Sequence, residues 1–162
     1  MFAVKLHDVP GRLVAGAYIL HAGLGKWGAD DEKAAGLHGS AANAFPFFKS
    51  MKPKQFTTML SAAEIATGTA LLLPVVPTAL AGLALTGFAG GLVTMYLRTP
   101  ALHKEGSVWP TPQGTAISKD SWLLGIGAGM VLDAMGRRKS RERRKIAKAA
   151  RRLAAEQQDA SQ

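Results

Sequence analysis

Two ionisable residues lie inside long apolar stretches, and they are the first candidates for chemistry. Glu64 is the only formally charged residue between Gln55 and Leu97, and His21 lies in an apolar segment near the N-terminus. A charge inside hydrocarbon is costly enough to need a reason. A hydrogen-bonded His21–Glu64 pair would offset the desolvation of both groups, and it could carry a proton or bind a quinone carbonyl. The alternatives are a structural polar contact between two helices and a protonated Glu64.

Other charges lie near the ends of the apolar stretches. Arg12 comes near the start of the first stretch and Asp133 near the end of the last one. We expect these two residues to form an ion pair that closes a helix bundle at one end. Lys26 lies near the other edge of the first stretch, where a long side chain can carry its ammonium group to water.

Glycines recur at a spacing that is typical of close helix packing. They form two pairs with three residues between the members, Gly87 with Gly91 and Gly125 with Gly129. Such small-residue pairs let helix backbones approach closely in membranes. We expect a structural role in packing, and the same faces could also dock a partner subunit.

Several kinds of site are excluded or not indicated. The chain has no cysteine, which excludes disulfides, thiol redox catalysis and Cys-ligated zinc or iron–sulfur sites. The histidines are not spaced with carboxylates in a way that predicts a metal site. A phosphate-binding loop, a nucleophile elbow and a dinucleotide fingerprint are all missing from the sequence. No catalytic residue can therefore be assigned from a motif.

The apolar stretches predict the elements that position these residues. The segment 55–97 is 43 residues long, about twice the ~20 residues that cross a bilayer core as a helix. A shorter segment, 34–48, is interrupted by Pro46 and is predicted to be interfacial or re-entrant. The sequence thus predicts an all-α integral membrane four-helix bundle in residues 1–136, with transmembrane helices at about 10–27, 53–73, 77–97 and 119–135.

The net charge of +9 comes from one block at the C-terminus. Ten of the 20 Lys and Arg residues lie between positions 137 and 152, beside the single acid Glu142. The positive-inside rule places this end in the cytoplasm, and four spans then place the N-terminus there too. In that topology Trp27, Tyr96, Trp109 and Trp122 fall at the outer interface, which favours aromatic rings.

The residues 137–162 are predicted to form a basic cytoplasmic tail. Apolar residues recur in it at helical spacing, from Ile146 to Leu153, so the tail is expected to be a helix. Each basic residue near an anionic lipid surface adds up to ~1 kcal/mol of binding. The tail has no aromatic residue to stack on a base, and we expect no nucleic-acid partner. The residues expected to contact anionic headgroups are Arg137, Arg138, Lys139, Arg141, Arg143 and Arg144.

Two segments resemble helices of the DoxX family of membrane proteins. In the first, Arg12 precedes Gly16 and Gly23 precedes Lys26, like the Arg–x–x–x–Gly start and Gly–x–x–Lys end of that family's first helix. The second segment has Glu64 four residues before a glycine, followed by a leucine run that ends at a proline. It is similar to the family's second helix. The resemblance covers residues from about 9 to 134.

The resemblance implies a compact four-helix bundle in the bacterial plasma membrane. DoxX-like proteins are associated with quinone-linked sulfur oxidation, as a subunit of thiosulfate:quinone oxidoreductase, and with membrane complexes that act against oxidative stress. It therefore implies an accessory or structural subunit of a redox or respiratory complex, in contact with other membrane subunits. The matched polar positions are Arg12, Lys26 and Glu64, and quinone is the one cofactor implied.

Two alternatives to an accessory subunit stay open. One is a quinone-reactive membrane oxidoreductase that uses Glu64 and His21. The other is a small transporter or proton-conducting bundle built around the central acid, although paired broken helices typical of transporters are not indicated.

Overall fold

The computed structural model describes residues 6–159. From residue 137 on, the side chains of 137, 138, 141, 143–145 and 149–159 lie outside the described part. The chain is all-α, and the described residues form no sheet, only an isolated bridge between His103 and Pro110. The six α-helices are α1 (Val9–Leu24), α2 (Asp31–Ala44), α3 (Pro53–Leu72), α4 (Thr78–Leu97), α5 (Thr115–Ser118) and α6 (Asp120–Asp159).

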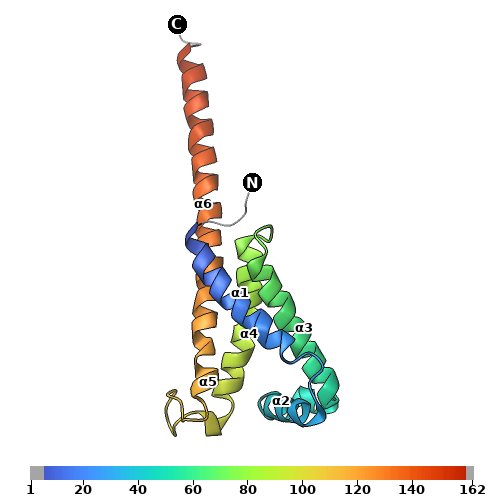
Figure 1. Cartoon of the computed structure of the whole chain (residues 1–162). Coiled ribbons are helices and arrows are strands. Elements are labelled where there is room, and N and C mark those ends of the chain that lie inside the picture. Colours follow the sequence, from blue (N-terminus) through green and yellow to red (C-terminus); the bar gives the residue numbers. More distant parts are fainter. Residues whose placement is uncertain (1–5, 160–162) are drawn as a thin grey trace.

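Four of these helices form the body of the protein. Figure 1 shows α1, α3, α4 and the first part of α6 together, with α2 and α5 at one end of the body. From the opposite end, α6 continues as a single helix toward the C-terminus. Three short 3-10 helices, Leu6–Asp8, Pro46–Ser50 and Pro100–Leu102, lie in the connections.

Prolines and caps mark the helix ends. Pro10 lies in the first turn of α1, and Pro53 is the first residue of α3, where a missing backbone N–H is no loss. Pro77 is the N-cap of α4, so the α3–α4 connection is a tight turn. The Asp30 side chain caps α2 by accepting a 2.8 Å hydrogen bond from the Lys33 backbone N–H.

The helices meet as two closely packed pairs. In the pair of α1 and α3, a Cβ built on Gly68 would lie 2.6 Å from the backbone nitrogen of Leu20. In the pair of α4 and α6, a Cβ on Gly127 would lie 2.7 Å from Thr86 Oγ1. Only glycine permits these crossings. A buried apolar cluster joins the two pairs, and its members are Ala15, Ile19, Leu71, Ala81, Leu85 and Met130.

The glycines that we expected at the helix contacts lie elsewhere. A Cβ built on Gly87, Gly91, Gly125 or Gly129 would meet nothing within 4 Å. The packing role inside the bundle is instead taken by Gly82 and Gly127, on other sides of the same helices. Two glycines of α4 separated by five residues point about 140° apart, because successive residues of a helix are about 100° apart.

Each of the four predicted spans coincides with an observed helix. The segments 10–27, 53–73 and 77–97 correspond to α1, α3 and α4, and 119–135 lies in the first part of α6. The segment 34–48 forms most of α2 and part of the following 3-10 helix. The expectation that the tail is helical is confirmed, since α6 runs unbroken to Asp159.

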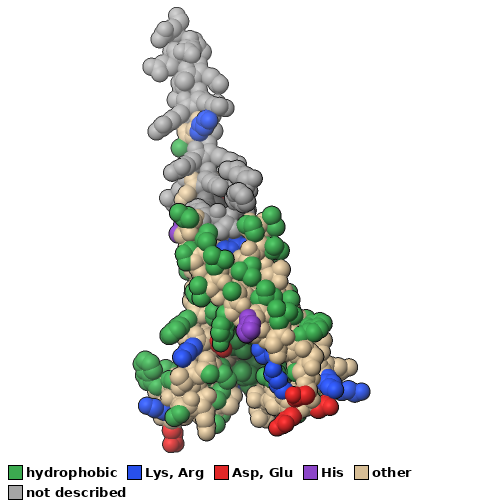
Figure 2. Space-filling view, viewed as in Figure 1, with side chains coloured by type: hydrophobic (Ala, Val, Ile, Leu, Met, Phe, Trp, Pro, Cys, Tyr) green, Lys and Arg blue, Asp and Glu red, His purple; other side chains and the backbone are tan. Residues whose placement is uncertain are grey.

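Apolar side chains cover much of the exterior of the bundle as well as its core. Large apolar side chains such as Val14, Tyr18, Leu80, Leu83 and Leu132 are more than half exposed, and Figure 2 shows apolar side chains over the visible surface of the body. The interior holds charged and hydroxyl side chains beside the apolar cluster. The buried polar residues are Asp8, Arg12, Thr57, Ser61, Glu64, Thr67 and Thr78.

Candidate functional site

Lys26 and Glu64 form a partly buried ion pair between the start of the α1–α2 connection and the middle of α3. The Nζ–Oε1 distance is 2.9 Å, and the Glu64 side chain is only 8% exposed. Lys26 Nζ also donates to the Ala22 carbonyl at 3.2 Å. One turn before Glu64, Ser61 donates a 2.7 Å hydrogen bond to the Gly23 carbonyl of α1. These contacts fix the position of the Glu64 carboxylate against the end of α1.

The predicted His21–Glu64 pair is wrong. His21 is exposed, and Glu64 is paired with Lys26 instead. The reason is the rotation of α1: Gly23 faces α3 closely, and a residue two positions earlier lies about 200° around the helix. The two candidates therefore belong to different sides of α1, and Lys26, which we expected to reach water, turns inward.

The Glu64 carboxylate has one oxygen free for a ligand. Among the described residues, Oε2 is buried and has no hydrogen-bond partner. Thr57 Oγ1 is also buried and has no hydrogen-bond partner among the described residues. Thr57 lies seven residues before Glu64, about two turns away on the same side of α3. Asp120, the first residue of α6, interacts electrostatically with both Glu64 and Lys26. The site is thus a carboxylate-rich polar cluster with one cation, suited to accept a hydrogen bond or a proton.

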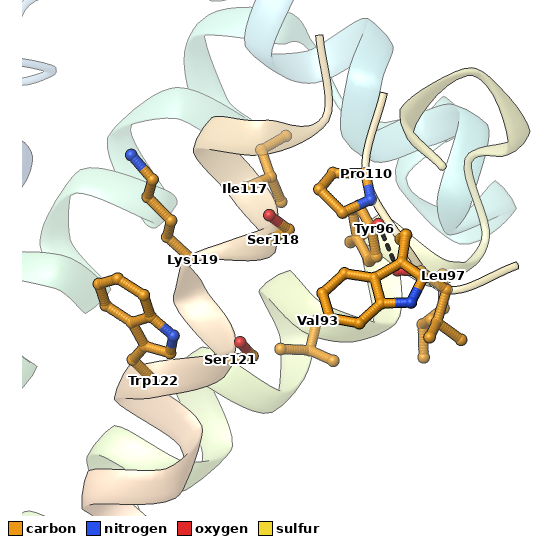
Figure 3. A pocket seen from close by; sticks show the side chains of 11 residues that line it. Val93, Tyr96, Leu97, Pro110, Ile117, Ser118, Lys119, Ser121 and Trp122 are labelled. Atoms are coloured by element: carbon orange, nitrogen blue, oxygen red, sulfur yellow. Dashed lines mark hydrogen bonds between the residues drawn. The ribbon is translucent and has the colours of Figure 1, made fainter. Parts of the chain in front are cut away.

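A mostly apolar cavity lies where α4, α5 and α6 meet the loop before α5. Its volume is about 410 Å³. Tyr96 helps to hold the loop by donating a 2.7 Å hydrogen bond from its hydroxyl to the Val108 carbonyl (Figure 3). Tyr96, Trp109 and Trp122, three of the four aromatic residues that we expected at one interface, all line this cavity. The sequence did not indicate it, because its shape depends on the fold of the loop 98–114.

Arg12 lies at the other end of α3 and binds the end of that helix. Its guanidinium donates hydrogen bonds to four backbone carbonyls, at distances from 2.7 to 3.1 Å. A fifth contact, at 3.4 Å, reaches the Thr78 hydroxyl at the start of α4. The last carbonyls of a helix have no intrahelical partner and carry partial negative charge, so a cation there is stabilising. The four acceptors belong to Ala70, Leu71, Leu73 and Val76.

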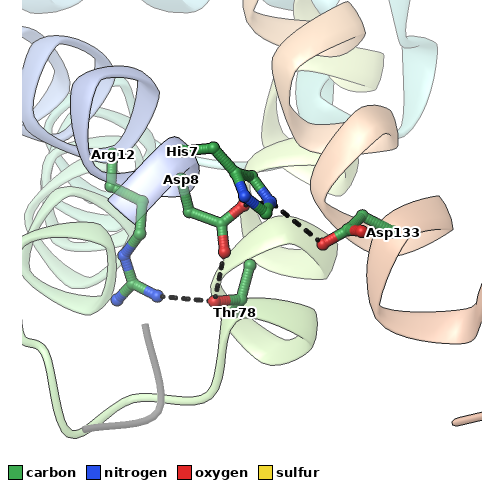
Figure 4. A network of polar contacts seen from close by, with 5 residues as sticks. All are labelled: His7, Asp8, Arg12, Thr78 and Asp133. Atoms are coloured by element: carbon green, nitrogen blue, oxygen red, sulfur yellow. Dashed lines mark hydrogen bonds and ion pairs between the residues drawn. The ribbon is translucent and has the colours of Figure 1, made fainter. Parts of the chain in front are cut away.

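The predicted Arg12–Asp133 ion pair is wrong as well, although the two residues belong to one polar network. Figure 4 shows Arg12 contacting Thr78, and Asp133 facing His7. The Thr78 hydroxyl donates to Asp8 Oδ2 at 3.2 Å. His7 Nε2 lies 3.3 Å from both Asp8 Oδ1 and Asp133 Oδ2. Arg12 is kept from Asp133 because the carbonyls of α3 already occupy its donors.

The remaining sequence-based candidates lie in the C-terminal helix. Lys139 is exposed, as expected for a residue that contacts lipid headgroups. The side chains of Arg137, Arg138, Arg141, Arg143 and Arg144 lie outside the described residues. Their role in lipid binding therefore stays a prediction.

The comparisons with known proteins add no relative. No protein-family model, no curated protein and no solved structure matches the chain. The likeness to the DoxX family rests only on the residues named above.

Proposed function

We propose that this protein is a DoxX-like membrane subunit with an accessory or structural role in a bacterial plasma-membrane redox or respiratory complex. In this proposal α1, α3, α4 and the first part of α6 span the bilayer. The observation that carries it is the apolar exterior: leucine, valine and aromatic side chains point outward, while the polar residues Arg12, Ser61 and Glu64 are buried. Contact of such an exterior with lipid is favourable, whereas its exposure to water costs free energy.

The composition of α4 supports a membrane setting. Within the described residues it is the one helix that is long and apolar enough to cross a bilayer by length and composition alone. A single such helix also occurs in cores of soluble proteins, where it is mostly buried. Here only 28% of its apolar stretch is buried inside the protein. Most of α4 therefore needs an apolar environment that the chain itself does not supply.

Two of the other helices, α1 and α3, are less apolar because they carry internal polar contacts. Arg12 on α1 is satisfied by backbone carbonyls, and Glu64 on α3 is paired with Lys26. A polar group that turns inward and finds a partner is compatible with a membrane span. The lower hydropathy of α1 and α3 therefore reflects their buried faces, since their outer faces carry Val14, Tyr18 and Met59.

The same topology assigns the two ends of the bundle. The basic part of α6 leaves the bundle at the end where His7 meets Asp133, and the positive-inside rule makes this the cytoplasmic end. Both termini are then cytoplasmic, and the basic residues from 137 to 144 follow within about two turns of the bundle, within reach of anionic headgroups. The aromatic cavity lies at the opposite, outer end.

The accessory role is supported by open glycine faces on two helices. Added side-chain atoms at Gly87 and Gly91 on α4, and at Gly125 and Gly129 on α6, would meet nothing in this chain. Faces of small residues let a second backbone approach closely. We infer that at least one of these faces packs against a helix of another subunit.

The test is affinity purification from native membranes in a mild detergent, with mass spectrometry and an optical spectrum for haem and flavin. Redox or respiratory subunits should co-purify at near-stoichiometric amounts. At least one of the variants Gly87→Leu/Gly91→Leu and Gly125→Leu/Gly129→Leu should lose them while keeping its melting temperature. The matched control is Gly36→Leu/Gly39→Leu on α2, which also adds side chains in open space and should keep the partners. Recovery of a lone chain from wild-type membranes would refute the accessory role.

One observation favours the alternative of a quinone-reactive oxidoreductase. The buried Glu64 Oε2 has no partner among the described residues, so it can accept a hydrogen bond from a quinol hydroxyl while Lys26 holds Oε1. Glu64→Gln preserves the shape and removes the proton acceptor, so it should abolish quinone-linked turnover without unfolding the protein. Unchanged turnover in this variant would eliminate the alternative.

A further inference from the structure

A second cluster of ionisable groups, at the cytoplasmic end of the proposed bundle, has the composition of a metal site. It consists of His7 and Asp8, just before α1, and Asp133 on α6. His7 and Asp133 are 126 residues apart in the sequence and come together only in the fold. The proposed function makes no use of this cluster.

Two of the three distances between the ligand atoms fit one small ion. His7 Nε2 lies 3.3 Å from Asp8 Oδ1 and 3.3 Å from Asp133 Oδ2, and all three atoms lie within 4.8 Å of one another. Neighbouring ligands around an ion with bonds of about 2.0–2.2 Å are separated by roughly 2.8–3.1 Å in octahedral geometry and roughly 3.3–3.6 Å in tetrahedral geometry. An ion can therefore bind between these atoms after small side-chain movements.

A hydrogen bond from Thr78 orients the Asp8 carboxylate. Asp8 uses Oδ1 toward His7, and its other oxygen, Oδ2, accepts a hydrogen bond from the Thr78 hydroxyl at 3.2 Å. Figure 4 shows the Asp8 carboxylate between His7 and Thr78. The Asp8 side chain is only 5% exposed. Such hydrogen bonds to ligating carboxylates are the usual supporting shell of a metal site.

We propose that His7, Asp8 and Asp133 bind a first-row divalent cation such as Zn²⁺, Mn²⁺ or Fe²⁺. One imidazole nitrogen and two carboxylates suit these ions, whereas Mg²⁺ and Ca²⁺ prefer all-oxygen sites. The two carboxylates balance the charge of the ion. His7 is 59% exposed, so the ion can enter from water, and water can complete its coordination.

The ion has a structural consequence in this position. It ties the segment before α1 to α6 at the point where the basic tail leaves the bundle. Because the ligands are far apart in sequence, the site exists only in the folded chain and the ion binds that state alone. Binding should therefore raise the melting temperature of the whole bundle.

The experiment is isothermal titration of Zn²⁺ into the full-length, detergent-solubilised protein, prepared with chelator and without a polyhistidine tag. Wild type should bind one ion, and His7→Ala and Asp133→Asn should each weaken binding by more than about tenfold. His21→Ala is the matched control, because His21 is an exposed histidine on the same part of the chain outside this cluster. It should bind like wild type.

Melting temperature gives a second, independent measurement. Excess Zn²⁺ should raise it for wild type and His21→Ala but not for His7→Ala. If no binding heat appears, the cluster is an ion-pair contact only, and the proposal is wrong. Binding of equal strength in wild type, His7→Ala and Asp133→Asn would place the ion elsewhere and would also overturn it. Neither result depends on partner subunits or quinone, so the proposed function is tested separately.

Discussion

Replacing Arg12 by Gln should destabilise the bundle more than the loss of any other single cation in the described residues. The guanidinium donates hydrogen bonds to four carbonyls, at the end of α3 and in the α3–α4 connection, and it also contacts the Thr78 hydroxyl. Gln can replace only one or two of these bonds. The turn that joins α3 to α4 would then keep several carbonyls without a donor.

The size of the effect follows from the burial of the acceptors. A hydrogen bond from a charged donor contributes about 1.5–3 kcal/mol. The contacts to Leu71 and Thr78 are buried, whereas those to Ala70, Leu73 and Val76 are partly exposed and can regain water. The unfolding free energy should therefore fall by about 3–5 kcal/mol, similar to the loss of one partner from a buried charged network. For a chain of this length the melting temperature should drop by about 6–20 °C.

Thermal unfolding in detergent micelles, followed by circular dichroism and tryptophan fluorescence, measures this change. Arg98→Gln is the matched control: Arg98 donates one 3.3 Å hydrogen bond to the Ala44 carbonyl and lies 5.3 Å from the centre of the Phe45 ring. It should cost only about 1–2 kcal/mol. Arg12→Lys should fall in between, because an ammonium has three donors and no planar fork. If Arg12→Gln melts no lower than Arg98→Gln, the capping argument fails.

Two further predictions concern helix packing and the Lys26–Glu64 pair. Gly68→Ala should lower the melting temperature, because the added Cβ would lie 2.6 Å from the Leu20 nitrogen. Gly87→Ala is the control and should not lower it, because Gly87 lies in open space. Equal melting temperatures of the two variants would contradict the packing described. Lys26→Met should destabilise the protein by leaving the buried Glu64 charge uncompensated, and adding Glu64→Gln should recover part of that loss. Melting curves for both single variants and the double variant test this coupling, and strictly additive effects would argue against a direct pair.

The positions of the helices could be predicted because their signals are local. Long apolar runs bounded by Pro53, Pro74 and Pro77 fix where α3 and α4 begin and end, whatever the rest of the chain does. The tail is helical over residues whose apolar positions recur at helical spacing. A membrane span is not such a local signal here, since length and hydropathy together select only α4 among the described helices.

The pairing of side chains could not be predicted, because it depends on how each helix is rotated about its axis. Position along the predicted spans favours His21 as the partner of Glu64 and places Lys26 at the outer edge. The close approach of Gly23 to α3 instead turns His21 away and brings Lys26 to Glu64. Glycine spacing has the same ambiguity: α4 carries glycines on several sides, and Gly82 is the one that meets α6.

The metal-type cluster was missed for a different reason. His7 and Asp8 lie before the first predicted span, and Asp133 lies at the end of the last, so no sequence spacing relates them. Asp133 was assigned to Arg12 because opposite charges at equal depth were the only available guide. The carbonyls at the end of α3, which compete for Arg12, are not visible as charges in a sequence.

The short first helix explains why the polar contacts lie where they do. With 16 residues, α1 is about 24 Å long, which is less than the ~30 Å of a typical hydrocarbon core. Arg12 near its start and Lys26 just beyond its end would then lie close to the edges of the hydrocarbon. Both residues have partners inside the protein: Arg12 binds the end of α3, and Lys26 binds Glu64. Neither side chain therefore has to reach water to be stabilised. If α1 spans a bilayer as proposed, this shortfall in length would be met by local thinning of the bilayer, at a cost of fractions of a kcal/mol per ångström.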